Sequence, residues 1–512
     1  MSATLIGAKA RSAPAESRYP SSIKEVNVAA FQSLGDEPKW VCVGCVRDEF
    51  LYETIEVMAP GECSYCEEIS SPRISIDGLA ELVEAAIQGH YERTSTEPDA
   101  FQYAMHNDRE IEYDWERDGD PIADIIADRV GCDESIAIDI LEILSEAHDR
   151  YDPSDGYDEE SEFSSESQYQ PKQADSGDWA ESWNRLEHAL KHESRLFNHE
   201  AFEILASVFS GLDRSSSKSG GVAIVPAGPS PEGHFLSLYR AREFQSSDAL
   251  GEALKKPADA LGPPPGRLAK AGRMNASGIS VFYGALEAGS ALAEVRPVVG
   301  SKVVVAKFEL LRDVQLLDLR ALESLTCEGS IFDPNYALEL SRHSFLNILS
   351  KRLVLPVMPN DQDHEYLITQ AVADYLASLQ EPTVDGIIFP SVQDGIGVNV
   401  VLFHKASMVE PLKFPPSTSF RVQLEDIDYE TGEPYSSYHL QIEQPEQLPK
   451  PSLIDDFWDS RLIYAKHRTP ALGLDLESIS VHTIKAVEIK TEEDRVSVTY
   501  TKQRGAVEDP SF

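Results

Sequence analysis

GRMNASGISVFYGALEAGSALAE, residues 272–294, is the stretch that most clearly indicates how the second half of the chain folds. Its glycines favour tight turns, because glycine adopts backbone conformations that other residues resist. Branched and aromatic side chains at 280–283 predict a short strand. Residues 286–295 predict a helix that buries Leu286, Leu292 and Val295 on one side. The stretch therefore predicts a loop, a strand, a turn and a helix, in that order.

Three chemically active side chains fall at the junctions of these predicted elements. Arg273 precedes the strand, Tyr283 ends it and Glu294 lies in the helix. A guanidinium can pair with phosphate, and a carboxylate can stabilise developing positive charge. An aromatic ring between them can stack on a flat ring. If the three converge, they suit a dinucleotide substrate.

The composition indicates a soluble protein with several domains. The chain has 512 residues, 42% of them hydrophobic, and a formal net charge of −42. We therefore expect about three domains. A surface this acidic repels nucleic acid, and the sequence has no evident basic patch, so we expect no nucleic-acid partner. No apolar run is long enough to span a membrane, and the N-terminus lacks the apolar core of a signal peptide. We expect a cytoplasmic protein without membrane contact.

Four cysteines have the spacing of a zinc site. They form two C-x2-C pairs with seventeen residues between the pairs: Cys42, Cys45, Cys63 and Cys66. Each short pair can bend back to present two thiolates, and two pairs can close a tetrahedral site. Four thiolates leave no open position, so zinc here would be structural. The alternative is four free buried cysteines.

Changes in composition along the chain predict its organisation. Apolar residues at helical spacing follow Asp77, Asp120 and Asp133, and we expect Asp77 to cap the first of these helices. Residues 152–178, in contrast, are acidic, rich in serine and nearly free of aliphatic side chains. Apolar and polar residues alternate after about residue 415, as in strands. In chain order we expect a disordered segment at 1–25, a zinc-binding and helical domain at 26–150, an acidic linker at 151–178, a helix and flexible joint at 179–220, a mixed α/β domain at 221–414 and a β-rich segment at 415–512.

Several motifs of the second half resemble those of the RES domain, in the same order. They are LYRAR (238–242), GRMN (272–275), VFYGALEAGSALAEV (281–295), YLITQAVADYL (366–376), and DGIIFPS (385–391) with NVVLF (399–403). The family takes its name from an arginine, a glutamate and a serine. In this chain they fall at Arg273, Glu294 and Ser391, with the family's tyrosine at Tyr283. The resemblance covers about residues 235–406.

The resemblance implies a fold similar to that of ADP-ribosyltransferases and an enzyme that destroys NAD⁺ by hydrolysis or phosphorolysis, as RES toxins of toxin–antitoxin pairs do. Arg240 and Arg273 would bind the pyrophosphate or a phosphate acceptor. Tyr283 would stack on nicotinamide or ribose. Glu294 would stabilise the oxocarbenium-like state through which the nicotinamide–ribose bond breaks. Ser391 would form a hydrogen bond to the nicotinamide amide or the ribose.

The front region is similar, more loosely, to the zinc-containing helical segment that precedes some RES domains and is related to the HEPN family. Arg185 and His192 match the R-x4–6-H spacing of HEPN ribonucleases. A solvated helix face explains this pair more simply than a nuclease site does.

The sequence thus predicts a multidomain α+β protein that consumes NAD⁺ and carries structural Zn²⁺. An antitoxin or regulatory protein is the macromolecular partner that the resemblance suggests. Transfer of ADP-ribose to a macromolecule is one alternative, since only the acceptor differs. A non-catalytic regulatory protein is the other, but the presence of all four family residues argues against it.

Overall fold

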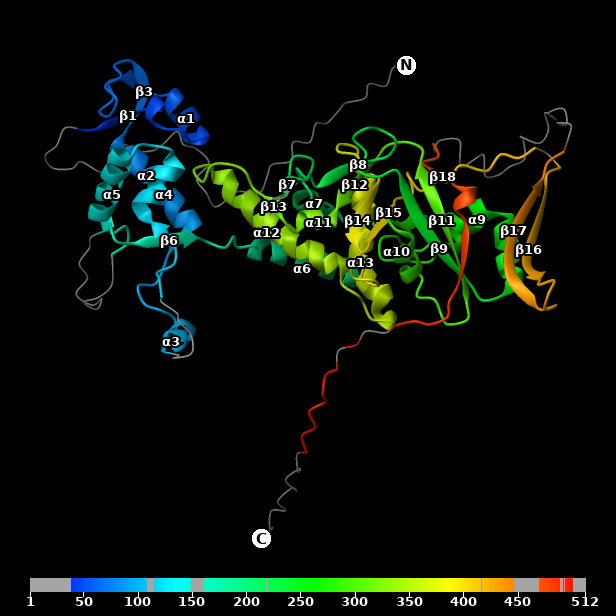
Figure 1. Ribbon diagram of the computed structural model, residues 1–512. Helices are drawn as coiled ribbons and strands as arrows, with labels where there is room; N and C mark the ends of the chain where they lie inside the picture. Colours follow the sequence, from blue (N-terminus) through cyan, green and yellow to red (C-terminus); the bar gives the residue numbers. More distant parts are fainter. Residues whose placement is uncertain are drawn as a thin grey trace, which may run out of the picture. The chain divides into compact units, whose positions relative to one another are not determined.

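The computed structural model describes most of the chain: residues 38–107, 115–148, 161–217, 220–415, 417–445, 469–488, 491 and 493–500. The fold is mixed α/β with several sheets (Figure 1). Within the described residues, no helix is long and apolar enough to cross a membrane. The chain divides into two compact units. The first comprises residues 1–224 and 317–375, and the second comprises residues 225–316 and 376–512.

The first unit begins with two small sheets and a helical core. One apolar cluster joins four of the helices, α1, α2, α4 and α5, because leucines and isoleucines at helical spacing face inward. Its helices are α1 (Glu49–Glu56), α2 (Ile76–His90), α3 (Ala100–Asn107), α4 (Ile122–Val130) and α5 (Glu134–His148). Its strands are β1 (Trp40–Cys42), β2 (Pro60–Gly61) and β3 (Ser71–Ser75), then β4 (Tyr91–Arg93), β5 (Asp120–Pro121) and β6 (Gln168–Pro171).

Two local predictions in this unit require correction. Ser75, not Asp77, caps α2, since its side chain accepts a hydrogen bond from the Gly78 N–H. The acidic linker predicted at 151–178 is wrong for residues 161–171, which include β6; residues 151–160 lie outside the described part of the chain. Phe163 and Tyr169 are buried there with their ring centroids 6.0 Å apart. Two large rings bury enough apolar surface to order an otherwise polar segment.

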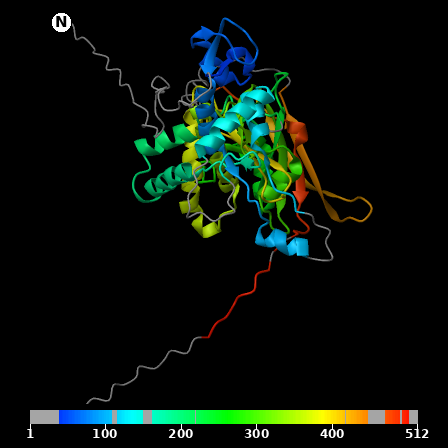
Figure 2. The same ribbon diagram turned by 90° about the vertical axis from the view of Figure 1, so that its left-hand side faces the viewer.

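The remaining helices of the first unit come from two distant parts of the sequence. They are α6 (Gly177–His192), α7 (His199–Val208), α11 (Leu319–Leu322), α12 (Pro334–Val354) and most of α13 (Gln362–Ser378), with the strand pair β7 (Ser216–Ser217) and β13 (Leu325–Thr326). Helices α6 and α7 lie side by side (Figure 2). The helix predicted within residues 179–220 is therefore interrupted, and Phe197 lies in the break with a positive φ and a fully exposed side chain.

Residues 317–375 pack with the N-terminal unit, although the predicted α/β domain at 221–414 includes them. The Trp183 ring of α6 lies against Phe345 of α12, with 5.8 Å between the centroids. The second unit is thus formed by two separate stretches of chain, and the stretch between them supplies helices, among them α12, that pack on α6. Sequence order alone does not reveal such a division.

The second unit is built on a large sheet with the order β18-β11-β9-β10-β15-β14-β12-β8, and β19 also pairs with β11. The strands are β8 (Ile224–Ala227), β9 (Ser237–Phe244), β10 (Phe282–Ala285), β11 (Lys302–Leu310), β12 (Val314–Asp318), β14 (Gly386–Pro390), β15 (Val398–Leu402), β18 (Leu472–Leu474) and β19 (Ser480–Thr483). The unit also contains α8 (Ser247–Lys255), α9 (Pro257–Leu261) and α10 (Ala288–Glu294).

Successive side chains of β11 point to opposite faces of this sheet, and helices pack against both faces. Val304, Ala306 and Phe308 belong to the main core, which also includes residues of α8 and α9. Val303 and Val305 face the other way, toward α10. The strand and helix predicted in the opening stretch are thus present as β10 and α10, with bounds that differ by a few residues from those expected.

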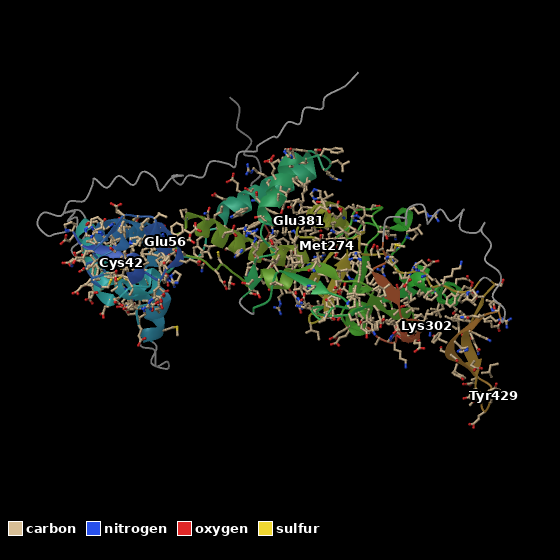
Figure 3. The ribbon with its side chains drawn as sticks, turned by 90° about the horizontal axis from the view of Figure 1, so that it is seen from above. Cys42, Glu56, Met274, Lys302, Glu381 and Tyr429 are labelled. Atoms are coloured by element: carbon tan, nitrogen blue, oxygen red, sulfur yellow. The ribbon has the colours of Figure 1, made fainter. Side chains whose placement is uncertain are left out.

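The predicted β-rich C-terminal segment contains four strands among its described residues. A hairpin of β16 (Ser419–Ile427) and β17 (Pro434–Glu443) extends from the second unit, and Figure 3 shows Tyr429 at its tip. Strands β18 and β19 instead extend the large sheet. The stretch 493–500, which includes alternating residues, forms no strand.

Candidate active site

The site begins where β9 and β10 separate. Strand β9 pairs with β11 along its whole length, from Ser237↔Glu309 to Phe244↔Lys302. Its pairing with β10 is confined to Tyr239↔Ala285. Beyond that pair, β9 and β10 are no longer joined as neighbouring strands, and the contact between them is made by side chains.

Arg240 makes this contact. Its Nη1 donates a hydrogen bond of 3.2 Å to the carbonyl of Tyr283, and its guanidinium lies 5.1 Å from the centroid of the Phe282 ring. Burial, together with the neighbouring charge of Arg242, lowers the pKa of Arg240 to about 10. The guanidinium therefore keeps its charge at neutral pH, and its remaining N–H groups can serve an anionic ligand.

Tyr283 holds the turn that carries Arg273. The Tyr283 hydroxyl donates to Asn275 Oδ1 at 3.0 Å and accepts from the Met274 N–H at 2.9 Å. The turn is closed by the bond from the Gly272 N–H to the Asn275 carbonyl, at 2.9 Å. A Cβ atom at Gly272 would lie 2.6 Å from Asn275 Oδ1, so glycine is required for this close approach.

Replacing Tyr283 by phenylalanine tests this arrangement. Asn275 is buried, so Tyr283→Phe leaves its Oδ1 and the Met274 N–H without this partner. We expect the free energy of unfolding to fall by about 1–3 kcal/mol in denaturant titrations. Tyr239→Phe is the matched control, because the described residues offer its hydroxyl no hydrogen bond. Equal losses in the two variants would contradict the assigned role of the Tyr283 hydroxyl.

Glu294 is held by two donors on one oxygen. The Ser391 hydroxyl and the Asn399 Nδ2 each donate to Glu294 Oε1 at 2.7 Å. Ser391 and Asn399 are buried, and Asn399 Oδ1 has no partner among the described residues. No further contact of the Glu294 carboxylate is recorded within the described part of the chain. Oε2 is thus the oxygen left to face a ligand.

The loop between β14 and β15 places Ser391. The Ser391 N–H donates to the Gly397 carbonyl at 2.8 Å, which returns the chain into β15. A Cβ at Gly397 would lie 2.0 Å from the hydroxyl oxygen of Ser290, so no larger residue fits. β14 and β15 pair through Phe389↔Asn399, and this register puts Asn399 beside Ser391.

Two cavities border Arg240 and Tyr283. One has a volume of about 300 Å³, and its lining includes Tyr239, Glu294, Phe389 and Asn399. The other has a volume of about 320 Å³, and its lining includes the cations Arg242 and Lys270. Each is near the lower end of the range for small-molecule sites. The first combines the Glu294 carboxylate with the Arg240 guanidinium, whereas the charged residues of the second are all cations. A larger hollow of about 650 Å³ contains neither Tyr283 nor Glu294.

The other two predicted residues lie outside these linings. Arg273 is half-buried in its turn and lines neither cavity. Ser391 reaches the site only through Glu294. Sequence reasoning missed Asn399 as a functional residue, although it begins the NVVLF motif. A polar side chain at the second position of an otherwise apolar strand was the available signal.

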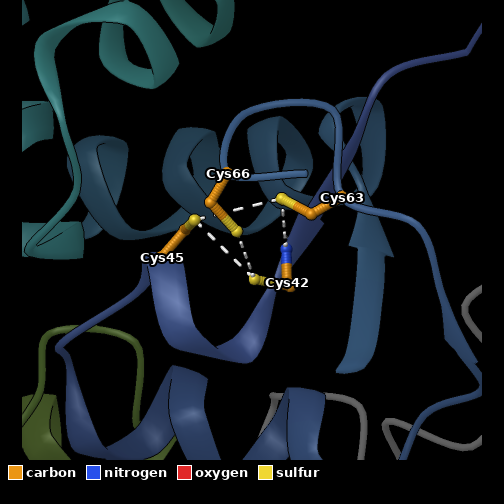
Figure 4. A group of neighbouring side chains, drawn as sticks. All are labelled: Cys42, Cys45, Cys63 and Cys66. Atoms are coloured by element: carbon orange, nitrogen blue, oxygen red, sulfur yellow. Dashed lines mark hydrogen bonds between the residues drawn. The ribbon is translucent and has the colours of Figure 1, made fainter. Parts of the chain in front are cut away.

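The four cysteines converge as their spacing predicts (Figure 4). Their Sγ atoms all lie within 4.8 Å of one another, and recorded separations are 3.4, 3.7 and 3.9 Å. A zinc–sulfur bond of about 2.3 Å in a tetrahedron requires sulfurs about 3.8 Å apart. Burial opposes ionisation of Cys63, but backbone N–H donors, first that of Tyr65, lower the pKa of its thiol to about 7. The cluster fits a divalent metal ion held by thiolates.

The Arg185 and His192 pair receives no support as a nuclease site. Arg185 contacts Ser182 and Glu200. His192 instead lies between two other histidine rings.

Comparison with known families identifies the region around the cavities. Residues 237–424 match the family model of the RES domain, and the match does not extend to the cysteine-bearing region. No curated protein and no solved structure matches the chain. RES domains form a toxin-like family related to NAD⁺.

Proposed function

We propose that the protein cleaves the nicotinamide–ribose bond of NAD⁺ at the cavity beside Glu294. The observation that carries this proposal is the Glu294 carboxylate, held through Oε1 by Ser391 and Asn399 at the wall of a cavity of about 300 Å³. Its location within the region that matches the RES domain supports the choice of substrate.

The two cavities suggest how NAD⁺ binds. Nicotinamide and its ribose would occupy the cavity of Glu294, where Tyr239 and Tyr283 provide aromatic walls. The pyrophosphate would lie at Arg240, toward the cavity that Arg242 and Lys270 line. In a chain with a net charge of −42, this local group of cations is the expected place for phosphate. Arg273 would support it from the adjoining turn.

In the reaction, the bond between the ribose anomeric carbon and the nicotinamide nitrogen breaks, and its electron pair leaves with nicotinamide. Glu294 Oε2 would stabilise the positive charge that develops on the ribose. Water adding to the anomeric carbon gives ADP-ribose and a proton. Inorganic phosphate adding there gives ADP-ribose 1″-phosphate and a proton. Ser391 acts as a positioning residue in this scheme, because it contacts Glu294 and not the cavity.

Arg240 should determine affinity for NAD⁺. We expect Arg240→Gln to raise KM for NAD⁺ about 10- to 100-fold with a smaller effect on kcat, since hydrogen bonds to charged groups contribute about 1.5–3 kcal/mol. Arg267→Gln is the matched control, because Arg267 is exposed and lines neither cavity. Steady-state kinetics measure both. An unchanged KM in Arg240→Gln would remove Arg240 from the binding site.

The acceptor is tested by product analysis. Purified full-length protein is incubated with NAD⁺ in buffers with and without phosphate, and the products are separated by chromatography. Hydrolysis yields ADP-ribose in both buffers, whereas phosphorolysis requires phosphate and yields ADP-ribose 1″-phosphate. When the NAD⁺ carries a label in its adenosine portion, label that stays attached to a macromolecule would instead indicate ADP-ribosyl transfer. Intact NAD⁺ in both buffers would contradict the proposed function.

A further inference from the structure

A cluster of three histidines lies in the first unit, outside the region of the proposed NAD⁺ site. His188 and His192 are four residues apart on α6 and therefore share one helix face. Their ring centroids lie 5.0 Å apart. His364, near the start of α13, lies 6.2 Å from His192 by the same measure. Three imidazoles from two helices thus face one small region of surface.

These separations suit a shared metal ion. An ion about 2.1 Å from an imidazole nitrogen lies about 3.2 Å from the ring centroid, so two rings on one tetrahedral ion have centroids about 5.2 Å apart. The His188–His192 separation of 5.0 Å is close to this value, and the His192–His364 separation of 6.2 Å must shorten by about 1 Å. Within the described residues, only the four cysteines already have their donor atoms within 4.8 Å of one another. His192 is exposed, so rotation about its side-chain bonds can turn its ring nitrogens toward the other two histidines.

Carboxylates already orient two of the three rings. His188 Nδ1 lies 3.4 Å from Glu193 Oε1, and His364 Nδ1 lies 3.1 Å from Glu365 Oε1. A metal-binding histidine usually gives its other nitrogen to a carboxylate in this way, which fixes the tautomer and makes the ligand more basic. Nε2 is then the nitrogen left for the ion in both residues.

The two helices are joined beside the cluster. Lys191 Nζ lies 2.9 Å from Glu365 Oε1 and 3.0 Å from Oε2, which links α6 to the start of α13. The lysine side chain is largely buried, with 13% exposed. This ion pair also neutralises the lysine charge, which would otherwise repel a cation. The ion pair therefore keeps α6 and the start of α13 together, which holds His192 near His364.

We propose that His188, His192 and His364 form a second metal site, which binds one divalent ion of the type that imidazole prefers, such as Zn²⁺ or Ni²⁺. The site is distinct from the cysteine cluster in ligand type and in position along the chain. Bound metal would fasten α6 to α13.

Nickel titration of full-length protein that carries one zinc per chain tests this proposal. Four thiolates hold zinc more tightly than exposed imidazoles do, so the single zinc stays at the cysteines and nickel reports the imidazoles. Calorimetry should give one Ni²⁺ per chain, and His192→Ala and His364→Ala should each weaken binding at least tenfold. His199→Ala is the matched control, since His199 is exposed on α7 and pairs with Glu203. Circular dichroism checks that each variant stays folded. Absence of nickel binding, or equal affinity in His192→Ala and His199→Ala, would overturn the proposal.

Discussion

Replacing Glu294 by glutamine should lower kcat for NAD⁺ cleavage by at least about 10²-fold, with little change in KM. Removal of one group that stabilises transition-state charge typically costs about 10²–10³-fold. The amide keeps the size of the side chain but loses the charge that faces the developing oxocarbenium. Because Glu294 contacts Ser391 and Asn399 through Oε1, the variant should still fold and still bind NAD⁺.

The matched control for this prediction is Glu287→Gln. Glu287 precedes the same short helix, is exposed and makes no capping hydrogen bond. Single-turnover measurements of nicotinamide release separate chemistry from product release in both variants. If Glu294→Gln turns over NAD⁺ as fast as Glu287→Gln does, the cavity of Glu294 is not the reaction site.

Removal of the metal from the cysteine cluster should unfold the first part of the chain. Structural zinc binds zinc-finger peptides with about 10–16 kcal/mol at neutral pH, and that energy supports folding. The cysteine-bearing segment is also tied to α5, because Tyr65 donates a hydrogen bond of 2.6 Å to Asp139. Loss of metal should therefore disturb the helical core as well as the two cysteine loops.

Elemental analysis of the wild-type protein should find zinc bound at the cysteine cluster, and the Cys63→Ser variant should lack that zinc. The variant should also melt at a lower temperature, with its first thermal transition lowered by about 10 °C or more, because several kcal/mol of stability are lost. Cys327→Ser is the control, since Cys327 lies outside the cluster. Treatment with a chelator should leave the rate of NAD⁺ cleavage unchanged as long as the second unit stays folded, because no cysteine lines the Glu294 cavity. A metal-free protein with an unchanged melting profile would contradict this account.

Local chemistry was predictable from sequence where neighbouring residues decide the structure. Two C-x2-C pairs and their spacing were sufficient to predict the cysteine cluster, because each pair folds on itself. The order of strand and helix around Tyr283 also followed from residue type. The two roles of Tyr283 were not predictable in this way. Its hydroxyl holds the turn that carries Arg273, and its side chain lines both cavities.

The features that could not be predicted from the sequence depend on contacts between residues far apart in the chain. Asn399 binds Glu294 across 105 positions of sequence. The pairing of β15 with β10, through Asn399↔Ala285, places it beside the helix that carries Glu294. Phe163 and Tyr169 order a segment whose average composition indicates disorder, since two buried rings outweigh many polar neighbours. The packing of residues 317–375 with the first unit depends on contacts such as that of Trp183 with Phe345, which no local pattern predicts.

The most direct test of the central claim is proton NMR of NAD⁺ mixed with the purified full-length protein, in phosphate buffer. Resonances of free nicotinamide should appear in step with the loss of NAD⁺, and the same sample of Glu294→Gln should show only slow change. NAD⁺ that stays intact with the wild-type protein, together with no binding of NAD⁺ by calorimetry, would contradict the claim that this site consumes NAD⁺.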